Sequence, residues 1–293
     1  MAVIFSRFID VLGKLQIAFL LPLFLLGYLV VYFASSYSVQ HLFAEFSTTQ
    51  FFTYLLVGIG AQLIDGALGM AYGVSASTFL MSVGVSPAAA SAAVHISEVF
   101  TTAVSGISHF RFKNVNKKLF RAMVIPGVLG AVVGAYILTA INGDFVKPLV
   151  SVYLIIMGIA ILRKALRRVV PREKFKHVGL LAMAGGFLDS IGGGGWGPVV
   201  TSTLLGKGRS PQYTIGTVNA TEFFVTFASA SVFTMFMGVQ NISVIAGLII
   251  GGIIAAPFGA LVVGKVSPKK LMVAVGVLII ALSLRNLINF LPL

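Results

Sequence analysis

Long apolar stretches run through the chain, and short polar or basic segments separate them. An α-helix needs about 20 apolar residues to span a bilayer, so the stretches that approach this length predict transmembrane helices. They lie at about 15–34, 87–109, 121–141, 147–163, 211–236, 242–264 and 269–290. The pattern predicts an all-α, polytopic membrane protein.

Two other apolar stretches are interrupted near their middle. The stretch at 51–83 is broken around Asp65 and Gly69, and the stretch at 178–205 is broken by four glycines at 192–195. The halves of the first stretch have about 15 residues each, or roughly 22 Å as helix, which is short for a full span. We expect a hairpin of two short or tilted helices at each break.

Four acidic residues interrupt otherwise apolar stretches, and they form two pairs at one constant interval. Asp65 and Glu98 are followed, 124 positions later, by Asp189 and Glu222. Without a gap, the 41 residues from Asp65 onward share 12 identities with the 41 residues from Asp189 onward. Because carboxylates at membrane depth are costly and usually functional, we infer that one unit was duplicated and that its charged centre was kept.

The basic residues indicate how the helices are oriented. The net charge is +13, and Lys and Arg gather in clusters between apolar stretches. If every cluster faces the cytoplasm, all basic residues except Lys147 and Arg285 follow the positive-inside rule. This topology predicts a multi-pass protein of the cell (inner) membrane with a cytoplasmic N-terminus and an external C-terminus, and it inserts the duplicated units in opposite directions. The charge therefore indicates orientation and attraction to the lipid bilayer rather than nucleic-acid binding.

The same topology divides the chain into four parts. Residues 1–50 form an N-terminal helix and an external loop, 51–163 the first transmembrane repeat, 164–177 a basic cytoplasmic linker and 178–293 the second repeat. With 58% hydrophobic and 10% charged residues, no room remains for a sizeable soluble domain. Each repeat is expected to contain one broken hairpin and three spanning helices. Inverted repeats of this kind place a substrate site near the bilayer midplane, where the broken helices meet.

Two motifs resemble those of a known family. Residues 189–198 read Asp-Ser-Ile-Gly-Gly-Gly-Gly-Trp-Gly-Pro, and in each repeat a Ser-Pro pair is followed after ten residues by the glutamate. Over roughly 51–289 the chain resembles the sulfite exporter TauE/SafE family, also called the TSUP anion permeases. The resemblance implies transport of a small anion, commonly sulfite, a sulfonate or a related sulfur-containing anion, across the cytoplasmic membrane. The first repeat departs from the glycine-rich pattern, and the helix at 15–34 is an addition to it.

The residues around the breaks suit an anion site. Glycines let backbone amides approach a ligand closely, and a helix that starts after the break has free amides to donate. His95, Glu98 and Thr102 share one helix face, and the second repeat has Asn219 and Thr226 at the matching positions. The alternative is that the glycines permit tight helix packing and that the histidine and aromatic residues fill the core. The candidate substrate-binding residues are Gly69, Tyr72, Gly73, His95, Thr102, Gly192, Gly193, Gly194, Gly195, Trp196, Asn219 and Thr226.

The four carboxyl groups pose a problem for an anion, because all four would repel it when ionised. No lysine or arginine lies at the predicted midplane, and loss of water around a carboxyl group favours its protonated form. We hypothesise that Glu98 and Glu222 carry or exchange protons coupled to anion movement. Asp65 and Asp189 are expected to cap the broken helices through backbone amides. A purely structural role for all four acids is the alternative.

Three classes of function fit this pattern. A secondary transporter for a small anion, working by alternating access, explains the inverted repeats, the breaks and the acids together. A passive anion channel fits the same fold, and a cation or metal-ion transporter would use the four carboxylates as ligands. An enzyme fits least, because the counterpart of His95 is Asn219, which is no general base. We expect no cofactor and no bound metal, while small-residue faces at 127–134 and 247–264 could serve internal packing or a homodimer.

Overall fold

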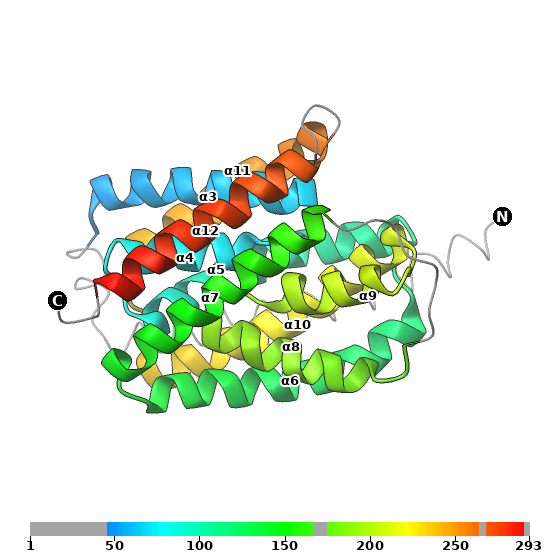
Figure 1. Cartoon of the computed structure of the whole chain (residues 1–293), viewed down its shortest axis with the longest axis horizontal. Helices are drawn as coiled ribbons and strands as arrows, with labels where there is room; N and C mark the ends of the chain where they lie inside the picture. Colours follow the sequence, from blue (N-terminus) through cyan, green and yellow to red (C-terminus); the bar gives the residue numbers. More distant parts are fainter. Residues whose placement is uncertain (1–45, 69, 167–174, 264–267, 290–293) are drawn as a thin grey trace, which may run out of the picture.

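A computed structural model describes residues 46–68, 70–166, 175–263 and 268–289 of the chain. Apart from short turns these residues are helical, and none of them lies in a strand. The described helices pack side by side as one bundle (Figure 1). The helix expected at 15–34 and most of the linker expected at 164–177 lie outside the described residues.

Both repeats contain the same order of elements, a broken hairpin followed by three long helices. The first repeat contains α3 (Thr48–Leu68), α4 (Tyr72–Ser82), α5 (Pro87–Arg111), α6 (Lys117–Ala140) and α7 (Gly143–Leu166). The second repeat contains α8 (Val178–Gly192), the π-helical turn η1 (Gly197–Thr201), α9 (Ser202–Gly206), α10 (Pro211–Met237), α11 (Ile242–Val263) and α12 (Pro268–Ile288).

The outer surfaces of the bundle carry large apolar side chains that can contact lipid. Within the described part of the chain, α6, α7, α10 and α12 are long and apolar enough to cross a membrane. On α6 the outer face exposes Ile125, Leu129 and Val133, whereas Gly130 and Gly134 on the opposite face are buried against α8. Such a run of exposed large apolar side chains is unusual in a soluble protein. The expectation of an all-α, polytopic membrane protein is confirmed.

Matching helices of the two repeats pack against each other in opposite directions. Near the start of α5, the ring of His95 lies 5.8 Å from the ring of Phe233, which is near the end of α10. Just beyond the end of α5, Asn114 Oδ1 accepts a hydrogen bond of 2.7 Å from Gln212 Nε2 at the start of α10. Since α5 and α10 occupy the same place in their repeats, this antiparallel packing confirms that the repeats are inverted.

The first hairpin helix of each repeat packs on the other repeat. α3 lies along α11, and α8 lies along α6. The helices approach closely because glycines face backbone carbonyl groups, as Gly251 of α11 does toward α3 and Gly130 of α6 does toward α8. Six glycines of the small-residue faces at 127–134 and 247–264 therefore serve packing within the chain: Gly127, Gly130, Gly134, Gly247, Gly251 and Gly252.

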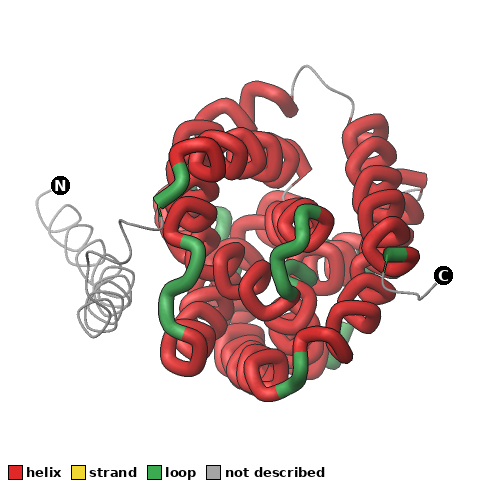
Figure 2. Tube along the Cα trace, turned by 90° about the vertical axis from the view of Figure 1, so that its left-hand side faces the viewer, coloured by secondary structure: helices red, strands yellow, loops and turns green. Residues whose placement is uncertain are grey.

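The loops are divided between the two ends of the bundle. The turns at 83–86, 141–142 and 238–241 lie at one end, on the left in Figure 1 and toward the viewer in Figure 2. At this end the backbone N–H of Ser47, before α3, donates to Ser243 Oγ at the start of α11 (2.9 Å). If the basic clusters face the cytoplasm, these three turns are external, and they share one end of the bundle with the start of α3.

The first break lies within the predicted region, after Asp65 and Gly66 rather than at them. α3 runs through Asp65 for 21 residues and α4 has only 11, so the expectation of two equal halves is wrong. An aspartate and one glycine are tolerated inside a helix at about 1 kcal/mol or less each, and they do not break it. Before α4, Ala71 takes a left-handed conformation with φ 88°.

Candidate functional site

The two breaks meet inside the bundle around one small cavity. Its volume is about 10 Å³, which is about what a single water molecule needs. All four acids that the sequence paired by their interval lie in its wall, together with backbone from both breaks. The lining residues are Asp65, Ala71, Tyr72, Gly73, Val74, Glu98, Asp189, Gly194, Gly195, Gly197, Pro198 and Glu222.

Backbone packs directly on backbone where the breaks meet. A Cβ added to Gly194 would collide with the backbone of Gly73 and Val74, and Gly194 has φ 152°. Gly193 ends α8 in the left-handed region, with φ 64°. Side chains at these positions would separate the two breaks and strain the turn. The glycine run is therefore explained first by this close approach.

Asp189 holds the second break together. Its Oδ1 accepts hydrogen bonds from the backbone N–H groups of Gly195 (2.6 Å) and Trp196 (2.9 Å), and its own carbonyl accepts from the N–H of Gly194 (3.0 Å). In the first repeat, the backbone N–H of Tyr72 lies near the carboxyl group of Asp65. Tyr72 is the counterpart of Trp196, so each aspartate faces an amide that follows its own break.

Side chains of the first repeat satisfy the carbonyl groups that the second break sets free. Ser91 Oγ donates to the carbonyl of Ser190 (2.6 Å), and Tyr153 Oη donates to that of Gly194 (2.9 Å). Ser77 Oγ donates to the carbonyl of Gly193. A buried carbonyl without a partner would cost about 1–3 kcal/mol, so these contacts fix the break. The sequence analysis missed all three donors, although Ser91 lies one turn before His95 on the same face.

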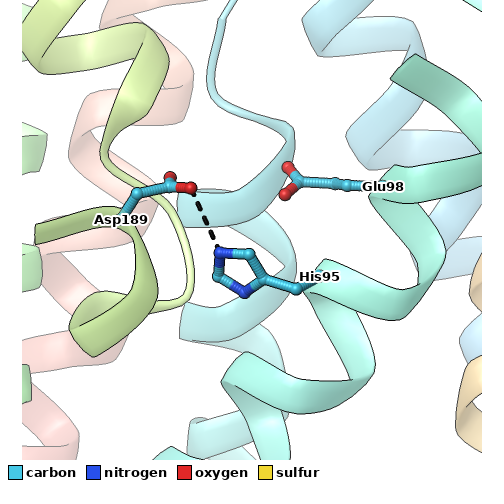
Figure 3. Close-up of side chains that lie close together, drawn as sticks. All are labelled: His95, Glu98 and Asp189. Carbon is cyan, nitrogen blue, oxygen red and sulfur yellow. Dashed lines mark hydrogen bonds and ion pairs between the residues drawn. The ribbon is translucent and has the colours of Figure 1, made fainter. Parts of the chain in front are cut away.

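His95 and Asp189 form a side-chain contact between the repeats (Figure 3). His95 Nε2 lies 3.1 Å from Asp189 Oδ2, and both side chains are almost completely buried. On the other side of the ring, Nδ1 lies 2.8 Å from the carbonyl of Ser91. The histidine thus links α5 of the first repeat to α8 of the second.

The carboxyl group of Glu98 points toward the side chain of Asp189 (Figure 3). The backbone N–H of Gly73 lies near its carboxyl group, while its Oε2 is buried and has no hydrogen-bond partner. Only 4% of the residue is exposed. A buried carboxylate oxygen without a donor is costly, so this oxygen is the atom of the site that can still accept a hydrogen bond or a proton.

The other candidate residues surround the cavity at a greater distance or serve the fold. Thr102 and Thr226 donate their hydroxyl hydrogens to the carbonyls of Glu98 (2.5 Å) and Glu222 (2.9 Å), one turn earlier. Asn219 donates to Ser105 Oγ of α5 (3.1 Å).

Two aromatic candidates and two glycines also have structural partners. The fully buried Trp196 donates from Nε1 to the carbonyl of Val218 (3.2 Å), and Tyr72 donates to that of Leu248 (3.4 Å). Gly192 makes room for the ring of Tyr153, and Gly193 for Ser77. Gly69 lies outside the described residues. The structure therefore brings together the four acids with Tyr72, Gly73, Gly194 and Gly195, and leaves the remaining described candidates outside the cavity wall.

Among the described residues, His95, Glu98 and Asp189 bring their ligand atoms within 4.8 Å of one another. A small cation could contact all three at this spacing. However, His95 Nε2 and Asp189 Oδ2 already bind each other, and Asp189 Oδ1 binds two amides. The three side chains therefore form a hydrogen-bonded network in which only Glu98 has a free oxygen.

Two inverted repeats whose broken helices meet at a buried polar cavity define a polytopic membrane transporter. The comparison with known families agrees: the chain belongs to the sulfite exporter TauE/SafE family, whose model matches residues 54–286. It is 43% identical over 246 residues to "Probable membrane transporter protein YtnM" of Bacillus subtilis (strain 168). The aligned region covers 80% of this chain and 82% of that protein. No solved structure matches the chain. The protein is thus a membrane transporter and not an enzyme.

Proposed function

We propose that the protein is a secondary transporter that moves a small anion, such as sulfite, a sulfonate or a related sulfur-containing anion, across the cell membrane. Transport is coupled to protons and proceeds by alternating access. The family it belongs to supports the anion, and the meeting of both breaks at one cavity supports a site that either side of the membrane reaches in turn.

The observation that carries the proposal is the chemistry of the cavity wall. Backbone N–H groups of Tyr72, Gly73, Gly195 and Trp196 point at carboxyl groups of the chain itself. A carboxylate and a sulfur oxyanion bind amides in the same way. These amides thus form an anion site that the protein's own acids occupy, and a substrate anion would replace one of them.

Protons are needed because the cavity is acidic. None of the described residues that line it is lysine or arginine. An anion would meet the charges of Asp65, Glu98, Asp189 and Glu222 unless protons neutralise them. A proton that enters with the anion removes one of these charges and so reduces the repulsion, and the proton gradient then drives the anion.

The cation transporter remains the alternative, since four carboxyl groups without a basic neighbour also suit a cation. A passive anion channel is the third possibility. The small volume of the cavity favours a closed binding site over an open pore.

The test uses the purified full-length chain in liposomes. Uptake of sulfite, thiosulfate, methanesulfonate and acetate is measured with and without an imposed pH gradient at zero membrane potential. We expect saturable uptake of a sulfur anion that the pH gradient drives uphill. Uptake that never exceeds equilibrium would indicate a channel, and cation uptake without anion uptake would overturn the proposal. A thermal-shift panel with the same anions identifies the substrate, because a ligand of the folded state raises its stability.

Variants with glutamine in place of Glu98 and Glu222 extend this test. Glutamine is always neutral, so an anion site should keep its substrate and a cation site should lose it. Loss of proton-driven accumulation in one variant would assign the coupled proton to that glutamate. Ser97→Ala and Thr221→Ala are matched controls, because each removes a neighbouring buried hydroxyl that binds only its own helix.

A further inference from the structure

The contact between His95 and Asp189 differs from the other polar contacts at the breaks. It joins two titratable side chains, one from each repeat, whereas the neighbouring contacts involve serine, tyrosine or backbone groups. It also has no equivalent in the other half, where Asn219 takes the place of histidine and binds Ser105. The hydrogen bonds around the ring show how many protons the pair holds.

Nδ1 of His95 must carry a hydrogen. The carbonyl oxygen of Ser91, 2.8 Å away, only accepts hydrogen bonds. Ser91 Oγ is 3.2 Å from the same nitrogen, and it has already given its one hydrogen to the carbonyl of Ser190 (2.6 Å). Both neighbours of Nδ1 are therefore acceptors.

A second hydrogen must lie between Nε2 and Asp189. When Nδ1 carries the hydrogen of a neutral imidazole, Nε2 has only a lone pair. An ionised Asp189 Oδ2 is also an acceptor, and two acceptors 3.1 Å apart repel each other. The pair thus holds one proton more than a neutral histidine beside an ionised aspartate. Because two amides donate to Oδ1 of Asp189, which suits a carboxylate, that proton is assigned to Nε2.

We propose that the His95–Asp189 pair is the proton carrier of the transporter, with one proton per transport cycle. The inference rests on the proposed function and names the group that couples protons to the anion. In the closed state the shared proton holds α5 of the first repeat to α8 of the second. Loss of the proton leaves two facing acceptors, so the repeats separate at this point. Binding of the proton and closure of the site are therefore one event.

The surroundings of the pair explain why the proton is held there. The titratable groups that face it are Asp65 of α3, Tyr72 of α4, Glu98 of α5, Tyr153 of α7 and Glu222 of α10. α11 has no titratable side chain, and those described on α6 and α12 are exposed. On α7 the partly buried Lys164 contacts Met70 Sδ (3.2 Å) beside the first break and does not line the cavity, so among the described residues of the cavity and the pair the imidazolium is the cation expected. Glu98 and Glu222 then stay protonated through the cycle, so that only Asp65 leaves the closed cavity with a net charge, and both glutamine variants should keep proton-driven accumulation.

The test compares steady-state accumulation in liposomes, which does not depend on turnover rate. Methanesulfonate is the probe, because its single charge does not change with pH, and sulfite is measured beside it. With the outside one pH unit more acidic than the inside, the ratio of internal to external methanesulfonate concentration should reach about ten for one proton per anion. In His95→Asn, which carries the residue of the other repeat, the ratio should fall to about one. Ser97→Ala, on the same helix, should keep the tenfold ratio.

A second variant guards against misfolding. In Asp189→Asn the amide oxygen still accepts from Gly195 and Trp196, and the amide nitrogen donates to His95 Nε2, so the geometry is kept while the proton is lost. We expect the ratio to fall to about one here as well. A tenfold ratio in either variant would overturn the proposal.

A spectroscopic measurement separates this inference from the proposed function. In nitrogen-15 NMR of histidine-labelled protein, both ring nitrogens of His95 should carry hydrogen in the closed state. The signal is assigned by its absence in His95→Asn, since the chain has four histidines. In Asp189→Asn, Nε2 should lose its hydrogen. If the wild type carries neither anion, the proposed function fails while this spectrum still tests the pair. A bare Nε2 in the wild type would refute the pair as proton carrier.

Discussion

The contact between the two breaks can be tested by adding one methyl group. In Gly194→Ala, the new Cβ would collide with the backbone of Gly73 and Val74, which cannot move aside as a side chain would. Overpacking of this kind costs about 1–3 kcal/mol. Alanine at φ 152° adds strain of about 1–2 kcal/mol. The folded state should therefore lose about 2–5 kcal/mol.

The assay uses the single tryptophan of the chain. Trp196 is fully buried two residues after the substituted glycine, so its fluorescence reports on the break during thermal unfolding in detergent. For a chain of this size we expect the midpoint to fall by roughly 4–20 °C. Gly60→Ala is the matched control, because its Cβ would meet nothing within 4 Å and alanine gains up to about 1 kcal/mol in a helix. Equal midpoints for the two variants would refute close packing of the breaks.

Two further predictions concern single contacts and orientation. Tyr153→Phe removes the donor to the carbonyl of Gly194 and should destabilise the protein by about 1–3 kcal/mol, measured by the same unfolding assay; an unchanged midpoint would contradict this role. Because the chain has no cysteine, Lys113→Cys and Gln240→Cys each provide one exposed label site. In intact cells an impermeant thiol reagent should modify only the second, and labelling of Lys113→Cys instead would reverse the topology.

Most of the fold follows from patterns that are local in the sequence. Apolar length predicts the spanning helices, and the interval between Asp65 and Asp189 predicts two matching units. Positive-inside charge predicts that they are inverted, as the packing of α5 on α10 confirms. The position of the first break was not predictable from Asp65, because a helix continues through a single polar residue while its hydrogen bonds are intact.

The site is harder to read, because its contacts join residues far apart in the chain. The sequence marks the four acids as special, and they do line one cavity. It does not show that Ser77, Ser91 and Tyr153 would bind carbonyls of the other repeat, since this depends on how the helices are rotated. It also places Thr102 beside the anion, whereas the hydroxyl binds its own helix. Residue spacing does not predict whether a threonine hydroxyl donates to a carbonyl of its own helix or to a ligand.

The exchange of hairpin helices between the repeats has a consequence for the origin of the protein. α3 is covered by α11 and α8 by α6. In half of this chain alone, the hairpin helix and the long helix that belongs to this exchange would each lose the helix that covers it. An ancestral gene of half the length could have worked only as a dimer whose two subunits entered the membrane upside down relative to each other. Fusion of two such genes would fix each subunit in one orientation and allow the two copies to diverge. His95 in one repeat and Asn219 at the matching position of the other are an example of such divergence.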